Sequence, residues 1–156
     1  MSSSSSNKVS LIKAWSVHAF TATGAVVGFV ALEAAFEGRS YDAVLWLLLA
    51  VFIDGIDGTF ARLFKVQEVL PRMDGKMIDF VVDFVNFVVI PTVIFYKEEM
   101  VSEVFLFPAV AGILYASLYH YGNKEQLTND LRFKGFPAFW NLIIYYLFIL
   151  KLGSLI

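Results

Sequence analysis

The chain has 156 residues, of which 58% are apolar and only 17% are charged, and its mean hydropathy of +0.69 is far above that of a soluble domain of this size. Its formal net charge of −2 and scattered basic residues give no footprint for a nucleic-acid partner, and we expect none. The absence of cysteine excludes disulfide frameworks and thiolate metal sites. The composition therefore indicates a protein of the lipid bilayer.

Five apolar stretches are close to the length of about 20 residues that a helix needs to cross the hydrocarbon core. They run over Leu11–Phe36, Val44–Phe64, Gly75–Tyr96, Val104–Tyr121 and Phe136–Leu150. Short polar connections separate them, so we predict an all-α, polytopic membrane helix bundle with about five transmembrane helices, in one domain over residues 11–156. The first ten residues are polar and low in complexity, and we expect residues 1–10 to be a disordered N-terminus.

Lysine and arginine gather on one side of these predicted spans. If the N-terminus is cytoplasmic, the inner side holds nine basic residues and the outer side holds three. The inner set is Lys8, Lys13, Arg62, Lys65, Arg72, Lys76, Lys124, Arg132 and Lys134, and the outer set is Arg39, Lys97 and Lys151. Cytoplasmic loops of membrane proteins collect such residues, so we predict an integral membrane protein with a cytoplasmic N-terminus.

Four aspartates stand out in the second and third spans. Asp54 and Asp57 lie three residues apart in one span, and Asp79 and Asp83 lie four apart in the next, so each pair shares one helix face. An unpaired aspartate at the centre of an inserted helix costs roughly 2.5 to 3.5 kcal/mol, so four would cost on the order of 10 kcal/mol or more. Oxygen ligands select hard cations, and we predict that the four carboxylates bind Mn²⁺ or Mg²⁺.

Small residues and one arginine accompany these carboxylates. Gly58 and Gly75 lie on the same helical stripes and leave room for a substrate to approach the backbone. Arg62 adds a forked cation suited to phosphate. Together these features predict a pyrophosphate site. Both helices meet at the loop over residues 65–74, which carries inner-side basic residues, so we expect the site near the cytoplasmic face.

Two segments of the chain resemble the signature of the CDP-alcohol phosphatidyltransferase family, DxxDGxxAR followed by GxxxDxxxD. They read DGIDGTFAR at positions 54–62 and GKMIDFVVD at positions 75–83, and every fixed position matches. Twelve residues separate Arg62 from Gly75, more than in the commonest spacing of the family. This longer spacing, together with the segments EVLPRMDGKMIDFVVDF and GFPAFWN, resembles the bacterial phosphatidylcholine synthase subfamily.

The resemblance extends from about Ala14 to Leu150 and implies a function. A protein of this kind transfers a phosphatidyl group from CDP-diacylglycerol to choline, giving phosphatidylcholine and CMP, and works as a homodimer in the bacterial inner membrane with its active site facing the cytoplasm. The family core has six membrane helices, so five predicted spans imply a domain shortened at its C-terminus.

The resemblance also implies roles for individual residues. Two divalent ions are expected, with Asp54, Asp57 and Asp79 as ligands, while Asp83 shares a metal and deprotonates the acceptor alcohol. The residues expected to contact CDP or its phosphates are Asp54, Gly58, Ala61, Arg62, Gly75 and Asp79.

Choline carries a quaternary ammonium, which cannot donate a hydrogen bond and is recognised by aromatic faces beside negative charge. We expect the acceptor site at Tyr119, Phe136, Trp140 and Asn141, with Tyr115, Tyr121 and Phe139 as further aromatic candidates. The two histidines, His18 and His120, are expected to be interfacial or packing residues.

Three alternatives remain open at this point. The acceptor could be serine, inositol or glycerol phosphate, with the same chemistry. The chain could be a shortened and inactive homologue that serves as a partner subunit. It could also be a cation-coupled transporter with buried aspartates, although such transporters usually contain internal repeats and no segment here repeats another.

Overall fold

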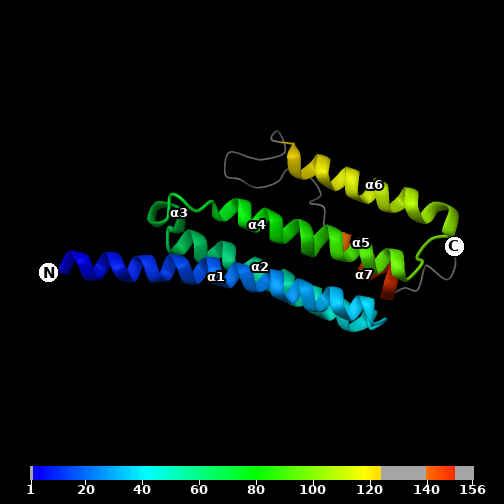
Figure 1. Cartoon of the computed structure of the whole chain (residues 1–156), viewed down its shortest axis with the longest axis horizontal. Helices are drawn as coiled ribbons and strands as arrows, with labels where there is room; N and C mark the ends of the chain where they lie inside the picture. The colour runs from blue at the N-terminus through cyan, green and yellow to red at the C-terminus, as the bar shows by residue number, and fades with distance from the viewer. Residues whose placement is uncertain (1, 124–139, 150–156) are drawn as a thin grey trace.

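The computed structural model describes residues 2–123 and 140–149, and every regular element in this part of the chain is helical. The elements are α1 (Ser2–Phe36), α2 (Ser40–Leu63), α3 (Val66–Val69), α4 (Gly75–Phe84), the π-helical segment η1 (Val85–Val89), α5 (Ile90–Lys97), α6 (Glu103–Gly122) and α7 (Trp140–Ile149). In Figure 1 the long helices run lengthwise along one bundle, and α4, η1 and α5 form a continuous rod. The predicted all-α bundle is confirmed.

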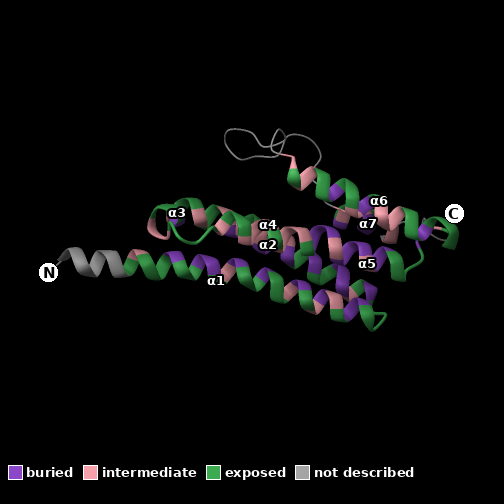
Figure 2. Ribbon diagram, turned by 45° about the horizontal axis from the view of Figure 1, so that its top comes forward, coloured by how far each residue is buried: buried purple, intermediate pink, exposed green. Residues whose placement is uncertain are grey.

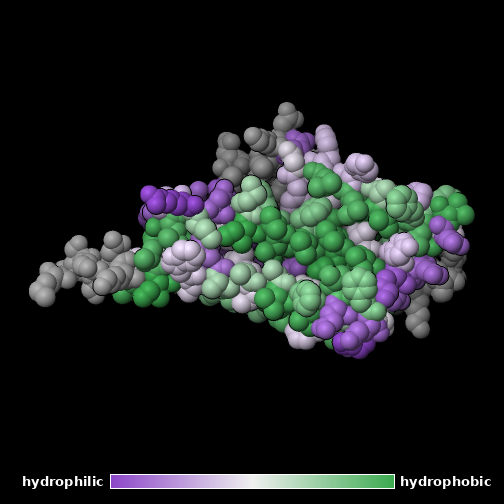
Figure 3. All heavy atoms as spheres, in the orientation of Figure 1, coloured by the Kyte–Doolittle hydropathy of each residue, from purple (hydrophilic) through white to green (hydrophobic). Residues whose placement is uncertain are grey.

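Four described segments are long and apolar enough to cross a bilayer. They are Val9–Phe36, Ser40–Leu63, Gly75–Lys97 and Glu103–Gly122, and they coincide with the first four predicted spans. The fifth predicted span lies partly outside the described residues, which cover it only as α7. Figure 3 shows hydrophobic side chains across the middle of the visible face and hydrophilic ones toward both ends, as a membrane-spanning bundle requires.

The first helix begins earlier than the sequence predicts. The polar residues 2–10, expected to be disordered, continue α1 back to Ser2. Extending an existing helix adds one hydrogen bond for each residue ordered, so it is much easier than starting a new helix. Serine has only a moderate penalty in a helix. The prediction of disorder therefore differs from the structure over residues 2–10.

The main apolar core lies in the half of the bundle around α5. This helix buries five of its residues, namely Ile90, Pro91, Thr92, Ile94 and Phe95, whereas α4 has no fully buried residue. Figure 2 shows the buried positions gathered around α5 and fewer of them toward α4 and α3. A smaller cluster of Ala14, Val17 and Val66 packs α3 against α1 at that other end. The half that carries the aspartates is therefore the less densely covered one.

Glycines on α1 bring it close to the rod formed by α4, η1 and α5. Asn86 Nδ2 donates a hydrogen bond to the Gly24 carbonyl oxygen at 3.0 Å. A Cβ on Gly28 would overlap Asn86 Oδ1, and a Cβ on Gly24 would lie 3.2 Å from Val82 Cγ1. Small residues four positions apart allow two helix backbones to approach closely in a membrane. This contact sets the position of α4 relative to α1.

The π-helical segment precedes a proline. Pro91 has no N–H to donate, and its ring would clash with the carbonyl group one turn earlier in a regular α-helix. The segment η1 relieves this conflict, and the Ile90 N–H bonds to the Val85 carbonyl oxygen. Asn86 lies within this wider turn and is 1% exposed. The π-helical segment therefore contains the side chain that donates a hydrogen bond to α1.

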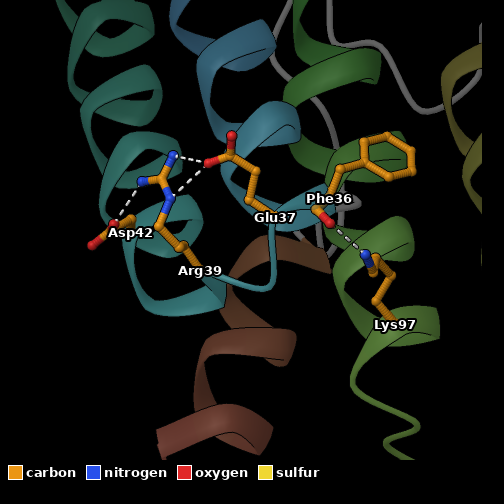
Figure 4. A network of polar contacts seen from close by, with 5 residues as sticks. All are labelled: Phe36, Glu37, Arg39, Asp42 and Lys97. Atoms are coloured by element: carbon orange, nitrogen blue, oxygen red, sulfur yellow. Dashed lines mark hydrogen bonds and ion pairs between the residues drawn. The ribbon is translucent and has the colours of Figure 1, made fainter.

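A polar network joins helix ends on the side of the bundle opposite to α3 (Figure 4). Arg39 donates to Glu37 Oε2 at 2.6 Å and 2.8 Å, and to Asp42 Oδ2 at 2.8 Å. Lys97 Nζ donates to the Phe36 carbonyl oxygen at 2.8 Å, which satisfies an unpaired carbonyl at the end of α1. The hydrogen bonds that Arg39 donates to Asp42 and then to Glu37 raise the pKa of Arg39, so this arginine remains charged.

Candidate metal centre

Two neighbouring helices bring three aspartates together. One carboxylate oxygen from each of Asp54, Asp57 and Asp79 lies within 4.8 Å of the others. Oxygens that bind one divalent cation at 2.0–2.6 Å can be at most about 5 Å apart, so the three fit a single ion. Asp57 is 3% exposed, and the other two are half-buried. The donor set is all oxygen, which suits Mg²⁺ or Mn²⁺.

Asp83 follows Asp79 by one helical turn on α4. Its carboxyl group lies within hydrogen-bonding reach of Asp54 on α2. The structure therefore brings all four predicted aspartates together, although only three belong to the tight oxygen group. In the described residues no lysine, arginine or histidine forms an ion pair with any of them. Buried acidic groups without a cationic partner favour binding of a metal ion.

A capping residue fixes where the helix with the second signature segment begins. Asp74 caps α4, since its Oδ1 accepts hydrogen bonds from the backbone N–H groups of Lys76 at 3.1 Å and Met77 at 3.2 Å. The helix therefore begins at Gly75, which puts Asp79 one turn inside it. Sequence reasoning did not single out Asp74, although an aspartate directly before a helical segment is a recognised start signal.

A cavity of about 630 Å³ lies beside the aspartates. Its wall comes from α1, the end of α2, α3 and the start of α4, which meet toward one end of the bundle (Figure 1). Of the predicted site residues, Asp57, Ala61, Arg62, Gly75 and Asp79 line it. Gly58 borders open space, because an added Cβ would meet only Arg62 Nη1, at 3.6 Å. A volume of several hundred Å³ is typical of a small-molecule site.

Basic side chains line the same cavity. Arg62, Lys65 and Lys76 all contribute to its wall. Arg62 Nη2 donates to Thr59 Oγ1 at 3.3 Å, and Lys65 pairs with Glu68 at 3.5 Å, so neither is bound to one of the four aspartates. A cavity lined both by carboxylates that could hold a divalent cation and by basic groups suits a ligand that carries phosphate.

The short helix α3 accounts for the twelve residues between Arg62 and Gly75. Lys65 turns the chain with a left-handed φ of 49°, and Val66 then packs, 5% exposed, against Ala14 and Val17 of α1. The longer spacing noted in the sequence thus forms a helix that closes one side of the cavity.

His18 also belongs to the cavity wall. It is 7% exposed, and its ring meets that of Trp15 edge-on at a centroid distance of 6.2 Å. A Cβ on Gly75 would lie 2.8 Å from His18 Cε1, so the imidazole fits in this position only because residue 75 has no side chain. Sequence reasoning assigned the space at Gly75 to substrate, whereas the structure gives part of it to His18. In the described part of the chain, the buried His18 Nε2 has no hydrogen-bond partner.

The expected acceptor residues do not line this cavity where the structure describes them. Tyr119 is 70% exposed on α6. Trp140 Nε1 donates to Ser117 Oγ at 2.7 Å, which joins α7 to α6. Asn141 is fully buried, and within the described residues its side-chain amide has no partner. Phe136 lies outside the described residues.

The fold and site define a polytopic membrane protein with an acidic centre suited to a divalent cation. The family model for CDP-alcohol phosphatidyltransferase matches residues 13–153, and the chain belongs to this family. The resemblance drawn from the two signature segments is thereby confirmed.

Curated relatives give a closer comparison. A phosphatidylcholine synthase of Pseudomonas aeruginosa is 41% identical over 140 residues, which are 90% of this chain and 59% of the relative. Phosphatidylcholine synthases of Borreliella burgdorferi and Rhizobium meliloti are each 39% identical, over 94% and 90% of this chain and over 63% and 58% of their own lengths. The chain thus spans about three fifths of the relatives that it matches. No solved structure matches it.

Proposed function

We propose that this protein transfers a phosphatidyl group from CDP-diacylglycerol to choline and so produces phosphatidylcholine and CMP. The observation that carries the proposal is the convergence of Asp54, Asp57 and Asp79, with carboxylate oxygens within 4.8 Å of one another, beside a cavity whose wall also carries three basic side chains. The relatives named as phosphatidylcholine synthases support choline as the acceptor.

The metal centre would consist of the four aspartates. Asp54, Asp57 and Asp79 would hold a divalent cation, Mn²⁺ or Mg²⁺, and Asp83 would share a second one. When bound, the metal supplies Lewis-acid polarisation of the phosphoryl oxygens and compensates their negative charge. The all-oxygen donor set and the absence of ion pairs to these aspartates in the described residues support this assignment.

The nucleotide would occupy the cavity. Ala61 and Gly75 are small wall residues beside which the CDP moiety would lie, and Gly58 borders open space. Arg62 would contact the phosphates, because its guanidinium is planar and matches their oxygens. Lys65 and Lys76 add positive charge to the same wall. Asp54 and Asp79 would contact the pyrophosphate from the metal side.

Asp83 would act as the base. The choline hydroxyl oxygen forms a bond to the phosphorus that carries the diacylglycerol, and the bond from this phosphorus to the bridging oxygen breaks. The electron pair leaves with CMP, and the hydroxyl proton passes to the Asp83 carboxylate. General-base catalysis of this kind contributes typically 10² to 10⁴-fold to the rate.

The membrane setting follows from the charges and the family. We propose a bacterial inner-membrane protein with its N-terminus and active site on the cytoplasmic side, which nine of twelve basic residues favour. The nucleotide head group of such a lipid would face the cytoplasm, which agrees with a cavity at the α3 end of the bundle, where the inner-side residues Lys65, Arg72 and Lys76 lie. A homodimer is the assembly expected from the family.

The test uses the purified chain in detergent or liposomes with CDP-diacylglycerol, Mn²⁺ and labelled choline. We expect labelled phosphatidylcholine and an equal amount of CMP. If the protein forms product with serine, inositol or glycerol phosphate but not with choline, the assignment of choline as the acceptor is wrong. Metal-dependent CMP binding without any product would indicate an inactive homologue, and metal-independent cation flux into liposomes would indicate a transporter.

A further inference from the structure

The first helix contributes polar side chains to the wall of the cavity. His18 and Thr21 lie three residues apart on α1, so they share one helix face, and both line the cavity. Each of the two is 7% exposed. Thr21 lies within hydrogen-bonding reach of Asp57 on α2. His18 lies against Gly75, at the start of α4. Neither residue belongs to the two signature segments, so α1 adds polar groups to the site that the signature does not include.

The imidazole of His18 is unpaired. Within the described residues neither of its ring nitrogens has a hydrogen-bond partner, and Nε2 is buried. The ring meets Trp15 edge-on, with the ring centroids 6.2 Å apart, and this contact packs the imidazole without pairing its nitrogens. A buried nitrogen without a partner is costly, and such groups often serve a functional site. Because His18 lines a cavity of about 630 Å³, its nitrogens are candidates to bond to the ligand of that cavity.

The position of His18 relative to the metal centre indicates which part of the ligand it meets. Asp79 follows Gly75 by four residues on α4, so it lies about 6 Å further along the helix axis. His18, beside Gly75, is therefore displaced from Asp79 toward the connection between α2 and α4. In the proposed function the metal holds the phosphates and the diacylglycerol extends into the bilayer. The nucleoside then extends the other way, toward His18.

We propose that His18 binds the nucleoside of the CDP-linked lipid through a hydrogen bond from or to one of its ring nitrogens. This inference rests on the proposed function and extends the same site from the signature helices to α1. An imidazole offers an N–H donor and an acceptor nitrogen, which can pair with the polar edge of cytosine or with the ribose hydroxyls. The basic residues Arg62, Lys65 and Lys76 suit phosphate, whereas the imidazole suits the uncharged nucleoside.

The test compares two ligands on the purified full chain in detergent with Mn²⁺. Pyrophosphate can meet the metal and the basic side chains, and CDP adds the nucleoside. We expect His18→Leu to weaken CDP binding about tenfold and to leave pyrophosphate binding within about twofold, because it removes one hydrogen bond to the nucleoside alone. Titration calorimetry measures both affinities.

Further variants separate hydrogen bonding from packing. His18→Asn and His18→Gln place an amide near the position of Nδ1 or of Nε2, so at least one of them should bind CDP more tightly than His18→Leu does. Thr23→Ala is the matched control, since Thr23 is an exposed residue of α1 that bonds to the Phe20 carbonyl oxygen at 2.6 Å. This control should bind both ligands as the wild type does.

A second readout needs no change at His18. The chain contains two histidines, so the ring-nitrogen signals of isotope-labelled histidine can be assigned with a His120→Gln variant. With Mg²⁺ present, CDP should shift the His18 signals, and pyrophosphate should shift them much less. A response shared by CDP and uridine diphosphate would assign the contact to the ribose, and a response to CDP alone would assign it to the base.

The outcomes separate this inference from the proposed function. Equal losses of CDP and pyrophosphate binding in His18→Leu would mean that the imidazole only supports the wall, and would overturn the inference. Unchanged CDP binding in that variant, or His18 signals that do not respond to CDP, would overturn it as well. CDP binding through His18 without any phosphatidylcholine formed would overturn the transfer reaction alone. A wild-type protein that binds pyrophosphate but not CDP would overturn both.

Discussion

The imidazole of His18 occupies the side of Gly75 on which any other residue would carry its side chain, with His18 Cε1 2.8 Å from the position of a Cβ. These two residues come from α1 and from the first position of α4, and both line the cavity. The contact ties the first glycine of the second signature segment to a helix that the signature does not include.

Gly75→Ala should therefore displace His18 or the start of α4. We expect a loss of about 1 to 3 kcal/mol in stability, as for other overpacked sites, together with weaker CMP binding. The double variant Gly75→Ala with His18→Ala should recover part of the lost stability and of the lost CMP binding, because the new methyl group no longer meets an imidazole ring. Thermal unfolding and CMP titration in the presence of Mn²⁺ measure these effects.

Gly55→Ala is the matched control, since nothing lies within 4 Å of its Cβ position. Alanine is favoured over glycine in a helix by about 1 kcal/mol, so this variant should be as stable as the wild type or slightly more stable. Equal destabilisation by Gly55→Ala and Gly75→Ala would contradict the steric account.

Gly28→Ala should loosen the packing of α1 on η1. The new Cβ would overlap Asn86 Oδ1, and we expect a cost of about 1 to 3 kcal/mol. Asn86→Ala alone should also destabilise, because it removes the hydrogen bond to the Gly24 carbonyl oxygen. A double-mutant cycle in unfolding experiments should show that the two changes are not additive, as expected for residues in contact.

The control for this pair is Gly112→Ala on α6, where a Cβ would meet no atom within 4 Å. Additive effects of Gly28→Ala and Asn86→Ala would show that the two side chains do not share this contact.

Metal binding should stabilise the protein through the acidic centre. Mn²⁺ at about 100 times its dissociation constant should add about 2.7 kcal/mol to the free energy of unfolding, and EDTA should remove this gain. Asp54→Asn, Asp57→Asn and Asp79→Asn should each weaken the Mn²⁺ dependence. Asp42→Asn is the control, because Asp42 pairs with Arg39 at the opposite end of the bundle. An unchanged Mn²⁺ shift in all three variants would rule out this centre.

Asp83→Asn tests the base. Turnover should fall by about 10² to 10⁴-fold, since asparagine cannot accept the hydroxyl proton. CMP binding should persist, because the cavity residues that we propose to contact CMP, namely Ala61, Arg62 and Gly75, are unchanged. Rapid single-turnover measurements of CMP release distinguish this chemical defect from slow product release. A variant with normal turnover would assign the proton to another group.

Much of the fold and of the metal centre could be predicted from the chain alone. The four described spans lie where hydropathy predicted them, and Asp54, Asp57 and Asp79 lie close together, as their helical spacing allows. Both signals are local, since bilayer crossing depends on a continuous apolar run and a shared helix face depends on spacings of three and four. The sequence therefore predicted Asp54, Asp57 and Asp79 as candidate metal ligands without knowledge of how their helices pack.

The contacts between helices could not be predicted from local sequence patterns. A periodic pattern tells which face of a helix a residue occupies, but not which neighbour covers that face. The contacts of His18 with Gly75 and of Asn86 with Gly24 join residues 57 and 62 positions apart, and α3 depends on the fit of Val66 against α1. The rings of Phe80, Phe84 and Tyr121 likewise come together only where α6 approaches α4.

The sequence by itself determined that the protein is a helical membrane bundle of this family and that its four signature aspartates share helix faces in pairs, because hydropathy, helical period and the signature are local properties of the chain. Only the tertiary structure decided which side chains wall the cavity and which aromatic rings adjoin Asp83, because these depend on the distances between helices that are far apart in the chain.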